Sequence, residues 1–203
     1  KHLSEFWMIE PEMAFYDLDE TIQLSEKMIK SVLTYVISKS EYDFKQLGRD
    51  TKELETLIQK EWKKVPYSEI VETFGVKWGD DISSEMEQKI VQHYDTPVFI
   101  THYPEELKPF YMKKDGFVAK CFDLIFPVVG EIIGGSQREE DYEKLKESMI
   151  ASGLDLDKMQ WYLDTRKWGS VTHSGFGLGF ERLLMFITGS TKIHDVIPFP
   201  VSY

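Results

Sequence analysis

The sequence predicts a fold of the α+β class, in which a mostly helical stretch lies between two segments rich in strands. Apolar residues recur at helical spacing through much of residues 19–94. Residues 3–9 and 117–126 are instead runs of aromatic and aliphatic side chains, which are typical of strands. The order of these segments along a chain of this length indicates one mixed domain.

Capping and chain-breaking residues set the bounds of most expected elements. Pro11 ends or interrupts the first strand, because its nitrogen cannot donate to a ladder. Asp19 or Thr21 caps the first helix, and Gly75 closes the third helix, which begins after Pro66. The expected helices span residues 19–38, 47–62, 67–74, 83–94, 139–152, 156–167 and 181–188. The expected strands span residues 3–9, 98–101, 117–126 and 175–180.

The composition is that of an acidic globular protein. The 203 residues include 24 Lys and Arg and 35 Asp and Glu, a formal net charge of −11. A surface of that charge repels a polyanion, which argues against non-specific nucleic-acid binding. The lone Cys121 excludes an internal disulfide framework and a multi-cysteine zinc site, and it predicts a cytoplasmic location. No apolar run reaches about 20 residues, so we expect no membrane span.

The sharpest chemical signal is the run GFGLGFERLLMF at residues 175–186. Alternate residues of a strand share a face, so Gly175, Gly177 and Gly179 leave one face without side chains. A flat ligand or a backbone segment can lie against such a face. Arg182 follows at the start of a helix, where it is placed to meet a phosphate. The alternative is a glycine-rich strand packed under a helix, with the arginine in a salt bridge.

A second signal is the acidic pair Asp123 and Glu131. Asp123 lies inside an apolar strand, where an ionised carboxylate is costly unless it is paired or bound to a metal. Two carboxylates that meet a polyphosphate suggest Mg²⁺, which takes a few carboxylates together with substrate oxygens. A structural ion pair between Asp123 and a lysine or arginine is the equal alternative.

Two further positions are candidate ligand contacts. Arg138 follows Gly134 and Gly135, and its planar guanidinium suits a carboxylate or carboxamide oxygen; simple solvation at the surface is the alternative. Phe6 is placed to stack on a nucleobase with His2 near phosphate, although an aromatic residue in a strand is more often part of a core.

These segments resemble class II aminoacyl-tRNA synthetases of the aspartate, asparagine and lysine subgroup. Residues 2–15 (HLSEF to EMAF) resemble the second half of the family's motif 2, and residues 175–186 resemble its motif 3. GEIIGGSQRE at 130–139 and DVIPFP at 195–200 are similar to the asparaginyl branch in particular. The resemblance covers nearly the whole chain.

The resemblance implies an antiparallel sheet of six or seven strands, flanked by helices, that binds ATP and Mg²⁺. Such enzymes are ligases that activate asparagine to asparaginyl-AMP and transfer it to tRNA(Asn), commonly as cytoplasmic homodimers. Motif 1, the first strand of motif 2 and the anticodon-binding OB domain have no counterpart in residues 1–203. We therefore expect this chain to be the C-terminal part of a catalytic domain and nearly inactive by itself.

The resemblance also implies roles for individual residues at the nucleotide. Phe6 would stack under adenine, and Arg182 would cover its other face and reach phosphate. His2 would lie near the phosphates and Glu5 near the adenine amino group. The ATP site would further be lined by Gly179, Phe180 and Glu181.

At the metal and the amino acid, the implied roles fall on the expected strand 117–126 and on the segment 130–139. Asp123 and Glu131 would hold Mg²⁺, and Glu131 and Arg182 would serve the chemical step. Arg138 would bind the side-chain carbonyl of the amino acid, with Gly134 lining that pocket.

Two alternatives stay open at this stage. Aspartyl relatives tend to have serine at the position of Gly134, so Gly134-Gly135-Ser136 favours asparagine over aspartate. An aspartyl-tRNA synthetase, or an asparagine synthetase derived from this fold, is the first alternative. A catalytically silent binding module is the second. His194 and Val201 stand where the family usually has arginine.

Overall fold

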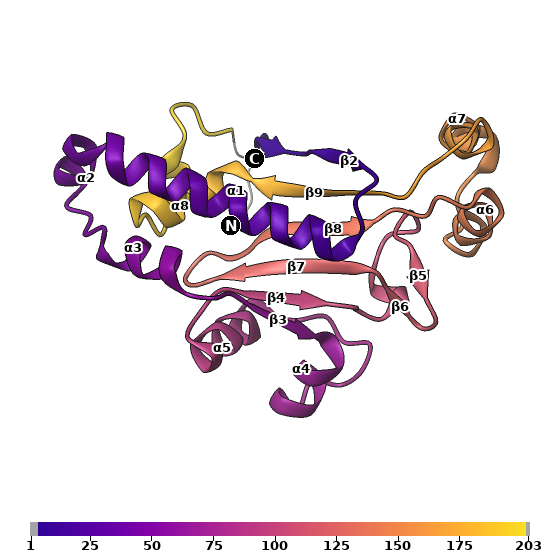
Figure 1. Cartoon of the computed structure of the whole chain (residues 1–203), viewed down its shortest axis with the longest axis horizontal. Coiled ribbons are helices and arrows are strands. Elements are labelled where there is room, and N and C mark those ends of the chain that lie inside the picture. Colours follow the sequence, from indigo (N-terminus) through magenta and orange to yellow (C-terminus); the bar gives the residue numbers. More distant parts are fainter. Residues whose placement is uncertain (1–3, 202–203) are drawn as a thin grey trace.

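The computed structural model describes residues 4–201 of the chain. Among these residues, a seven-stranded sheet has the strand order β1-β9-β8-β7-β4-β3, and β2 also pairs with β9 (Figure 1). The strands are β1 Met8–Ile9, β2 Glu12–Ala14, β3 Lys63–Pro66, β4 Val98–Thr101, β7 Cys121–Phe126, β8 Gly130–Gln137 and β9 His173–Gly179, with β5 Lys114–Asp115 and β6 Val118–Ala119 forming a separate pair.

Eight α-helices are present in the same described part of the chain. They are α1 Leu18–Lys39, α2 Glu41–Leu47, α3 Lys52–Gln59, α4 Tyr67–Phe74, α5 Ser84–Tyr94, α6 Tyr142–Ala151, α7 Leu156–Lys167 and α8 Phe180–Thr188. Short 3₁₀ turns occur at Glu105–Leu107 and Ile193–Val196. None of the helices in residues 4–201 is long and apolar enough to cross a membrane.

The expected α+β class is confirmed, and the sheet is antiparallel apart from one pair. Every pairing between described strands is antiparallel except that of β3 with β4. The antiparallel sheet that the resemblance implies is therefore present, but the expected strands do not include β2, β3 or β8, and the parallel pairing of β3 with β4 was not expected.

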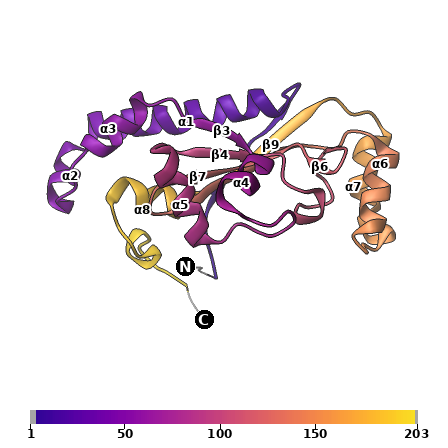
Figure 2. The ribbon, with the colours of Figure 1, turned by 90° about the horizontal axis from the view of Figure 1, so that it is seen from below.

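Helices cover the sheet on both faces. Figure 2 shows α1 and α3 on one side of the sheet and α4 and α5 on the other. On the α1 side, Leu33, Leu54, Phe122 and Phe176 belong to one buried apolar cluster. A second cluster packs α4 and α5 against β4 and β7. The burial of both clusters fixes which residues of each strand face which layer.

The register of β8 and β9 separates an apolar face from a bare one. Ile133 lies opposite Leu178 on the α1 side, whereas Gly134 lies opposite Gly177 on the other side. A Cβ atom at Gly177 would lie 2.5 Å from the Met8 side chain, so only flexible side-chain ends from the β1–β2 segment cover the bare face there. The strand therefore presents a glycine face, as the alternation predicts.

Some expected bounds are wrong for local reasons. The helix expected over residues 47–62 is shorter, because α3 spans only Lys52–Gln59. A separate helix, α2, ends at Leu47 and is closed by Gly48 in the left-handed conformation. The helix expected from residue 139 begins at Tyr142, after the Glu139 N–H donates to the Tyr111 carbonyl. The strand expected over residues 117–126 is interrupted at Lys120.

The first expected strand is also shorter than the sequence suggests. Within the described part of residues 3–9, only Met8–Ile9 pairs with β9, and Pro11 separates this strand from β2, as expected. The helices α6 and α7 project as a hairpin beyond one end of the sheet (Figure 1). They pack around a small cluster of their own that includes Leu145, Met149 and Leu163.

Candidate active site

A cavity of about 610 Å³ lies where α5, β7, β8 and the start of α8 meet. The side chains that matter for chemistry come from separate parts of the sequence. They are Tyr103, Asp123, Glu131, Arg182, Lys192 and His194. The structure thus brings three predicted site residues, Asp123, Glu131 and Arg182, to one cavity.

Asp123 projects from the middle of β7 into this cavity and forms an ion pair. Its Cα partners are Ile100 on β4 and Gly134 on β8. Lys108 Nζ lies 2.6 Å from Asp123 Oδ2, and the two side chains are only 14% and 15% exposed. The ion-pair alternative for Asp123 is therefore present in the structure.

The lysine is itself held in place by an aromatic ring. Lys108 Nζ lies 3.8 Å from the ring centroid of Tyr103, whose side chain also hydrogen-bonds Asp123. Burial lowers the pKa of Lys108, but Asp123 and its neighbours raise it further, so the net pKa lies above the ordinary value. Lys108 is therefore charged at neutral pH.

Glu131 lies beside Asp123 on the neighbouring strand, near Gly134. From the point where a Cβ would be placed on Gly134, Glu131 Oε1 is 3.1 Å and Asp123 Oδ1 is 3.6 Å away. Burial first, and then the charge of Asp123, raise the pKa of Glu131 to about 7. A larger residue at 134 would crowd the space between these two oxygens.

The two carboxylates fit a magnesium site that is completed by a substrate. The raised pKa of Glu131 shows that its charge is poorly compensated, even with Lys108 and Arg182 nearby. Mg²⁺ commonly takes one or two carboxylates and fills its other positions with water and phosphate oxygens. Among the described residues, no cluster of three or more His, Cys, Asp or Glu side chains is placed to hold a metal ion. Two neighbouring carboxylates are a donor set that suits Mg²⁺ together with a polyphosphate.

Arg182 closes the cavity from the first turn of α8. Its Nη1 donates to the carbonyl oxygen of Glu131, which ties the start of α8 to the start of β8. Gly179 is the residue just before the helix, and a Cβ built there would make ordinary contacts of 3.8 Å with the stem of Arg182. Arg182 thus lies beside the acidic pair, where a phosphate would bring opposite charge.

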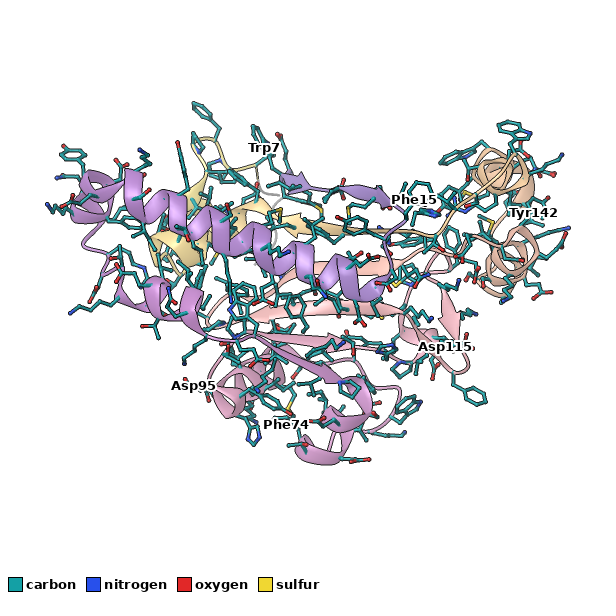
Figure 3. The ribbon with its side chains drawn as sticks, viewed as in Figure 1. Trp7, Phe15, Phe74, Asp95, Asp115 and Tyr142 are labelled. Carbon is teal, nitrogen blue, oxygen red and sulfur yellow. The ribbon has the colours of Figure 1, made fainter. Side chains whose placement is uncertain are left out.

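The neighbours of Arg182 anchor the N-terminal segment. Glu181 is 3% exposed, and its Oε1 accepts a 2.8 Å hydrogen bond from the Trp7 N–H. The ring of Phe180 stacks with Trp7 at 6.2 Å, and Trp7 is labelled in Figure 3. Glu181 and Phe180 thereby hold the segment that carries Glu5 and Phe6.

Phe6 and Glu5 lie just before β1, and both are exposed. Phe6 is 59% exposed, so it is not a core residue and its ring is free to take a ligand. The predicted role of His2 concerns a position outside the described residues. The roles of Glu5 and Phe6 at adenine stay predictions.

Arg138 lies at the far end of β8, away from the cavity. Its Nη2 is 2.5 Å from Glu12 Oε1, and its Nη1 donates to Ser136 Oγ at 2.6 Å. The guanidinium also lies 5.1 Å from the ring centroid of Tyr111. The alternative of a merely solvated Arg138 is wrong, because the arginine is fixed by three partners at the edge of the glycine face.

The sequence did not reveal several of these partners. Glu12 lies across from Gly175 in the β2–β9 pairing and covers its bare face. Met8, Glu10 and Glu12 occupy alternate positions, so their side chains are expected on one strand face. This alternation was the sequence signal for Glu12. Lys108 and Tyr103 lie outside the regular strands, and no spacing rule links them to Asp123.

A family model for class II tRNA synthetases (D, K and N) matches residues 1–203. The chain belongs to the class II tRNA synthetases. An asparagine--tRNA ligase of Phocaeicola vulgatus is 44% identical over 98% of this synthetase chain and 47% of its own length. One of Desulfotalea psychrophila is also 44% identical, over 98% of the chain and 48% of its own length.

The solved structures agree with the family. Asparaginyl-tRNA synthetase from Pyrococcus horikoshii, complexed with asparaginyl-adenylate, has a TM-score of 0.93 and 34% identity. The match covers 99% of the synthetase chain and 48% of that protein. The chain therefore spans about half the length of the relatives that it matches.

Proposed function

We propose that this synthetase chain is the C-terminal part of the catalytic domain of an asparagine--tRNA ligase. The reaction would join asparagine to AMP at the expense of ATP, release pyrophosphate, and transfer asparagine to tRNA(Asn). The observation that carries the proposal is the meeting of Asp123, Glu131 and Arg182 at one cavity beside the glycine face. The names of the relatives and of the P. horikoshii complex support asparagine as the amino acid.

The nucleotide end of the site is formed by the N-terminal segment and the start of α8. Phe6 would stack on one face of adenine, and Arg182 would cover the other face and reach the phosphates. Gly179, Phe180 and Glu181 shape this end, with Glu5 near the adenine amino group and His2 near phosphate. The exposure of Phe6 and the anchoring of Trp7 by Glu181 support this arrangement.

Asp123 and Glu131 would hold Mg²⁺ between the protein and the polyphosphate. When bound, the ion would supply charge neutralisation as pyrophosphate leaves. The chain's own contribution is to place two carboxylates beside the cation of Arg182, so that the phosphates are oriented for in-line attack. The asparagine carboxylate would attack the α-phosphorus directly, and no side-chain nucleophile is needed.

The amino acid would lie along the glycine face, with its side chain toward Arg138. Arg138 is a donor and Glu12 is an acceptor, and together they complement an amide, which has one carbonyl oxygen and one NH₂ group. Aspartate would bring a carboxylate against Glu12, so the pair would disfavour it. A charged group that a bound ligand covers and leaves unpaired typically costs about 1–3 kcal/mol.

The remaining assignments follow from the same proposal. The partners would be ATP, asparagine and tRNA(Asn), with a second copy of the enzyme in a homodimer. The cytoplasm is the proposed location, since aminoacyl-tRNA is consumed there by the ribosome. The single cysteine agrees with a reducing compartment.

The test is a calorimetric titration of the 203-residue chain with two non-hydrolysable adenylate analogues, asparaginyl-sulfamoyl and aspartyl-sulfamoyl adenosine, in the presence of Mg²⁺. We expect the asparaginyl compound to bind about tenfold more tightly or better. Glu12→Gln is the matched variant that removes the charge facing the amide. Tighter binding of the aspartyl analogue, or no binding of either compound, would contradict the proposal.

A further inference from the structure

Lys108, the cation beside the pair Asp123 and Glu131, has no part in the roles assigned so far. Lys108 lies 2.6 Å from Asp123 Oδ2, whereas Asp123 Oδ1 is turned toward Gly134 and Glu131. Oδ2 of Asp123 is thus already paired with an ammonium group, whereas Oδ1 lies on the side of Gly134. The positive charge of Lys108 therefore contributes to the net charge of the site.

The lysine is fixed there. Its ammonium lies over the ring of Tyr103, 3.8 Å from the centroid, and Tyr103 is 2% exposed. An ammonium held against an aromatic face and a carboxylate has little freedom to swing away. Tyr103 and Asp123 both line the cavity, so the charge of Lys108 acts on whatever enters it.

The net charge of the cavity affects whether a divalent cation binds alone or with a polyphosphate. The cavity is lined by four carboxylate side chains, Asp81, Glu87, Asp123 and Glu131. Lys108 is paired with one of them, Asp123, and so reduces the net negative charge. A bare divalent cation would meet a site of reduced negative charge and a nearby ammonium group that repels it. A polyphosphate that carries the same cation would be attracted by that ammonium group as well as by Arg182.

Resting on the proposed function, we propose that Lys108 is a positioning residue that makes the Asp123–Glu131 pair take a divalent cation with a polyphosphate rather than alone. It does so through Asp123, by occupying one carboxylate oxygen and lowering the net negative charge of the pair. The geometry assigns this role to a residue outside the strands that carry the pair.

The experiment compares two ligands on the same variants of the 203-residue chain. Mn²⁺ alone is titrated by electron paramagnetic resonance, and Mg²⁺ with a non-hydrolysable ATP analogue is titrated by calorimetry. In Lys108→Met, we expect Mn²⁺ to bind about tenfold more tightly or better, and the nucleotide complex to bind about tenfold more weakly. Opposite shifts are the signature, since a merely structural loss would weaken both.

Three further variants make the result specific. Lys108→Gln keeps a hydrogen-bond donor toward Asp123 without the charge and should behave like Lys108→Met. This variant also provides the test if Lys108→Met does not fold. Lys108→Arg keeps the charge and should shift both affinities much less than Lys108→Met does. Lys113→Met removes another partly buried lysine, which pairs with Glu140, and should change neither affinity.

The outcomes separate this inference from the proposed function. Weaker binding of both ligands, or no change in either, in folded Lys108→Gln would overturn the role of Lys108. If the unsubstituted chain binds no nucleotide, the proposed function fails. The Mn²⁺ titration then still decides the charge effect of Lys108, because tighter Mn²⁺ binding supports it and unchanged binding refutes it.

Discussion

Glu131→Gln should stabilise the chain at alkaline pH and change its stability little in acid. Burial and Asp123 raise the pKa of Glu131 from its ordinary value of 4.5 to about 7. An acid with a raised pKa in the folded state binds its proton more tightly there than in the unfolded chain. Its contribution to stability therefore falls as pH rises above 4.5, and the loss is complete above pH 7.

The size of the effect follows from that interval. At about 1.4 kcal/mol for each pH unit, the interval from 4.5 to about 7 corresponds to about 3 kcal/mol of lost stability when Glu131 is ionised. About 1 kcal/mol of this is already lost at pH 5.5. The advantage of Glu131→Gln over the unsubstituted chain should thus grow by about 2 kcal/mol between pH 5.5 and pH 8.5.

The assay is urea unfolding at 25 °C, without divalent cations, across that pH range. Subtracting the curves of the two proteins cancels the titration of the other carboxylates. Glu72→Gln, an exposed carboxylate on α4, is the matched control and should show a constant difference. A difference that stays flat between pH 5.5 and 8.5 for Glu131→Gln, or that shrinks, would refute the reasoning about the acidic pair.

Three other results are expected. Gly135→Ala should destabilise the fold by about 2 kcal/mol or more, since the new Cβ would lie 2.6 Å from the Phe122 ring in the core; urea unfolding beside Gly179→Ala, where the new Cβ would make only ordinary contacts of 3.8 Å, is the check. Glu12→Gln should reduce the preference for the asparaginyl over the aspartyl adenylate analogue by about tenfold, as measured by calorimetry; an unchanged ratio would remove Glu12 from specificity. Cys121, buried and with its pKa raised to about 11 by burial, should resist iodoacetamide at pH 8 until the chain unfolds, and fast labelling of the folded chain would be contrary to this.

The part of the fold that the sequence predicts is the part fixed by local rules. Alternating glycines place the bare face of β9 correctly, since side chains of a strand must alternate. The helix Tyr67–Phe74 matches its expected bounds because Pro66 and Gly75 mark both ends. The strand Val98–Thr101 also matches, since its four residues are buried on both faces.

The rest depends on contacts between distant residues. The strand Lys63–Pro66 is short and charged, and it pairs only because β4 lies beside it, so its sequence carries little strand signal. The helix expected from residue 47 begins only at Lys52, because Gly48 adopts a left-handed conformation that hydrophobic periodicity does not detect.

The site residues also fall into those that local sequence predicts and those that depend on contacts between distant residues. Asp123, Glu131 and Arg182 stand out in the sequence, because a charged residue in or beside an apolar strand is costly unless it is paired or binds a ligand. Lys108 joins them only through the path of the loop before β7, and that path is set by the packing of Tyr103 rather than by a motif. Arg138 was foreseen, but its partner Glu12 lies 126 residues away in the chain.

The most direct test of the central claim is a crystal structure of the chain grown with Mg²⁺ and a non-hydrolysable ATP analogue. The account predicts a metal ion bound to Asp123 and Glu131, with phosphate oxygens in contact with both the ion and Arg182. Nucleotide bound elsewhere, with the Asp123–Glu131 pair free of metal and Arg182 still on the Glu131 carbonyl, would contradict it.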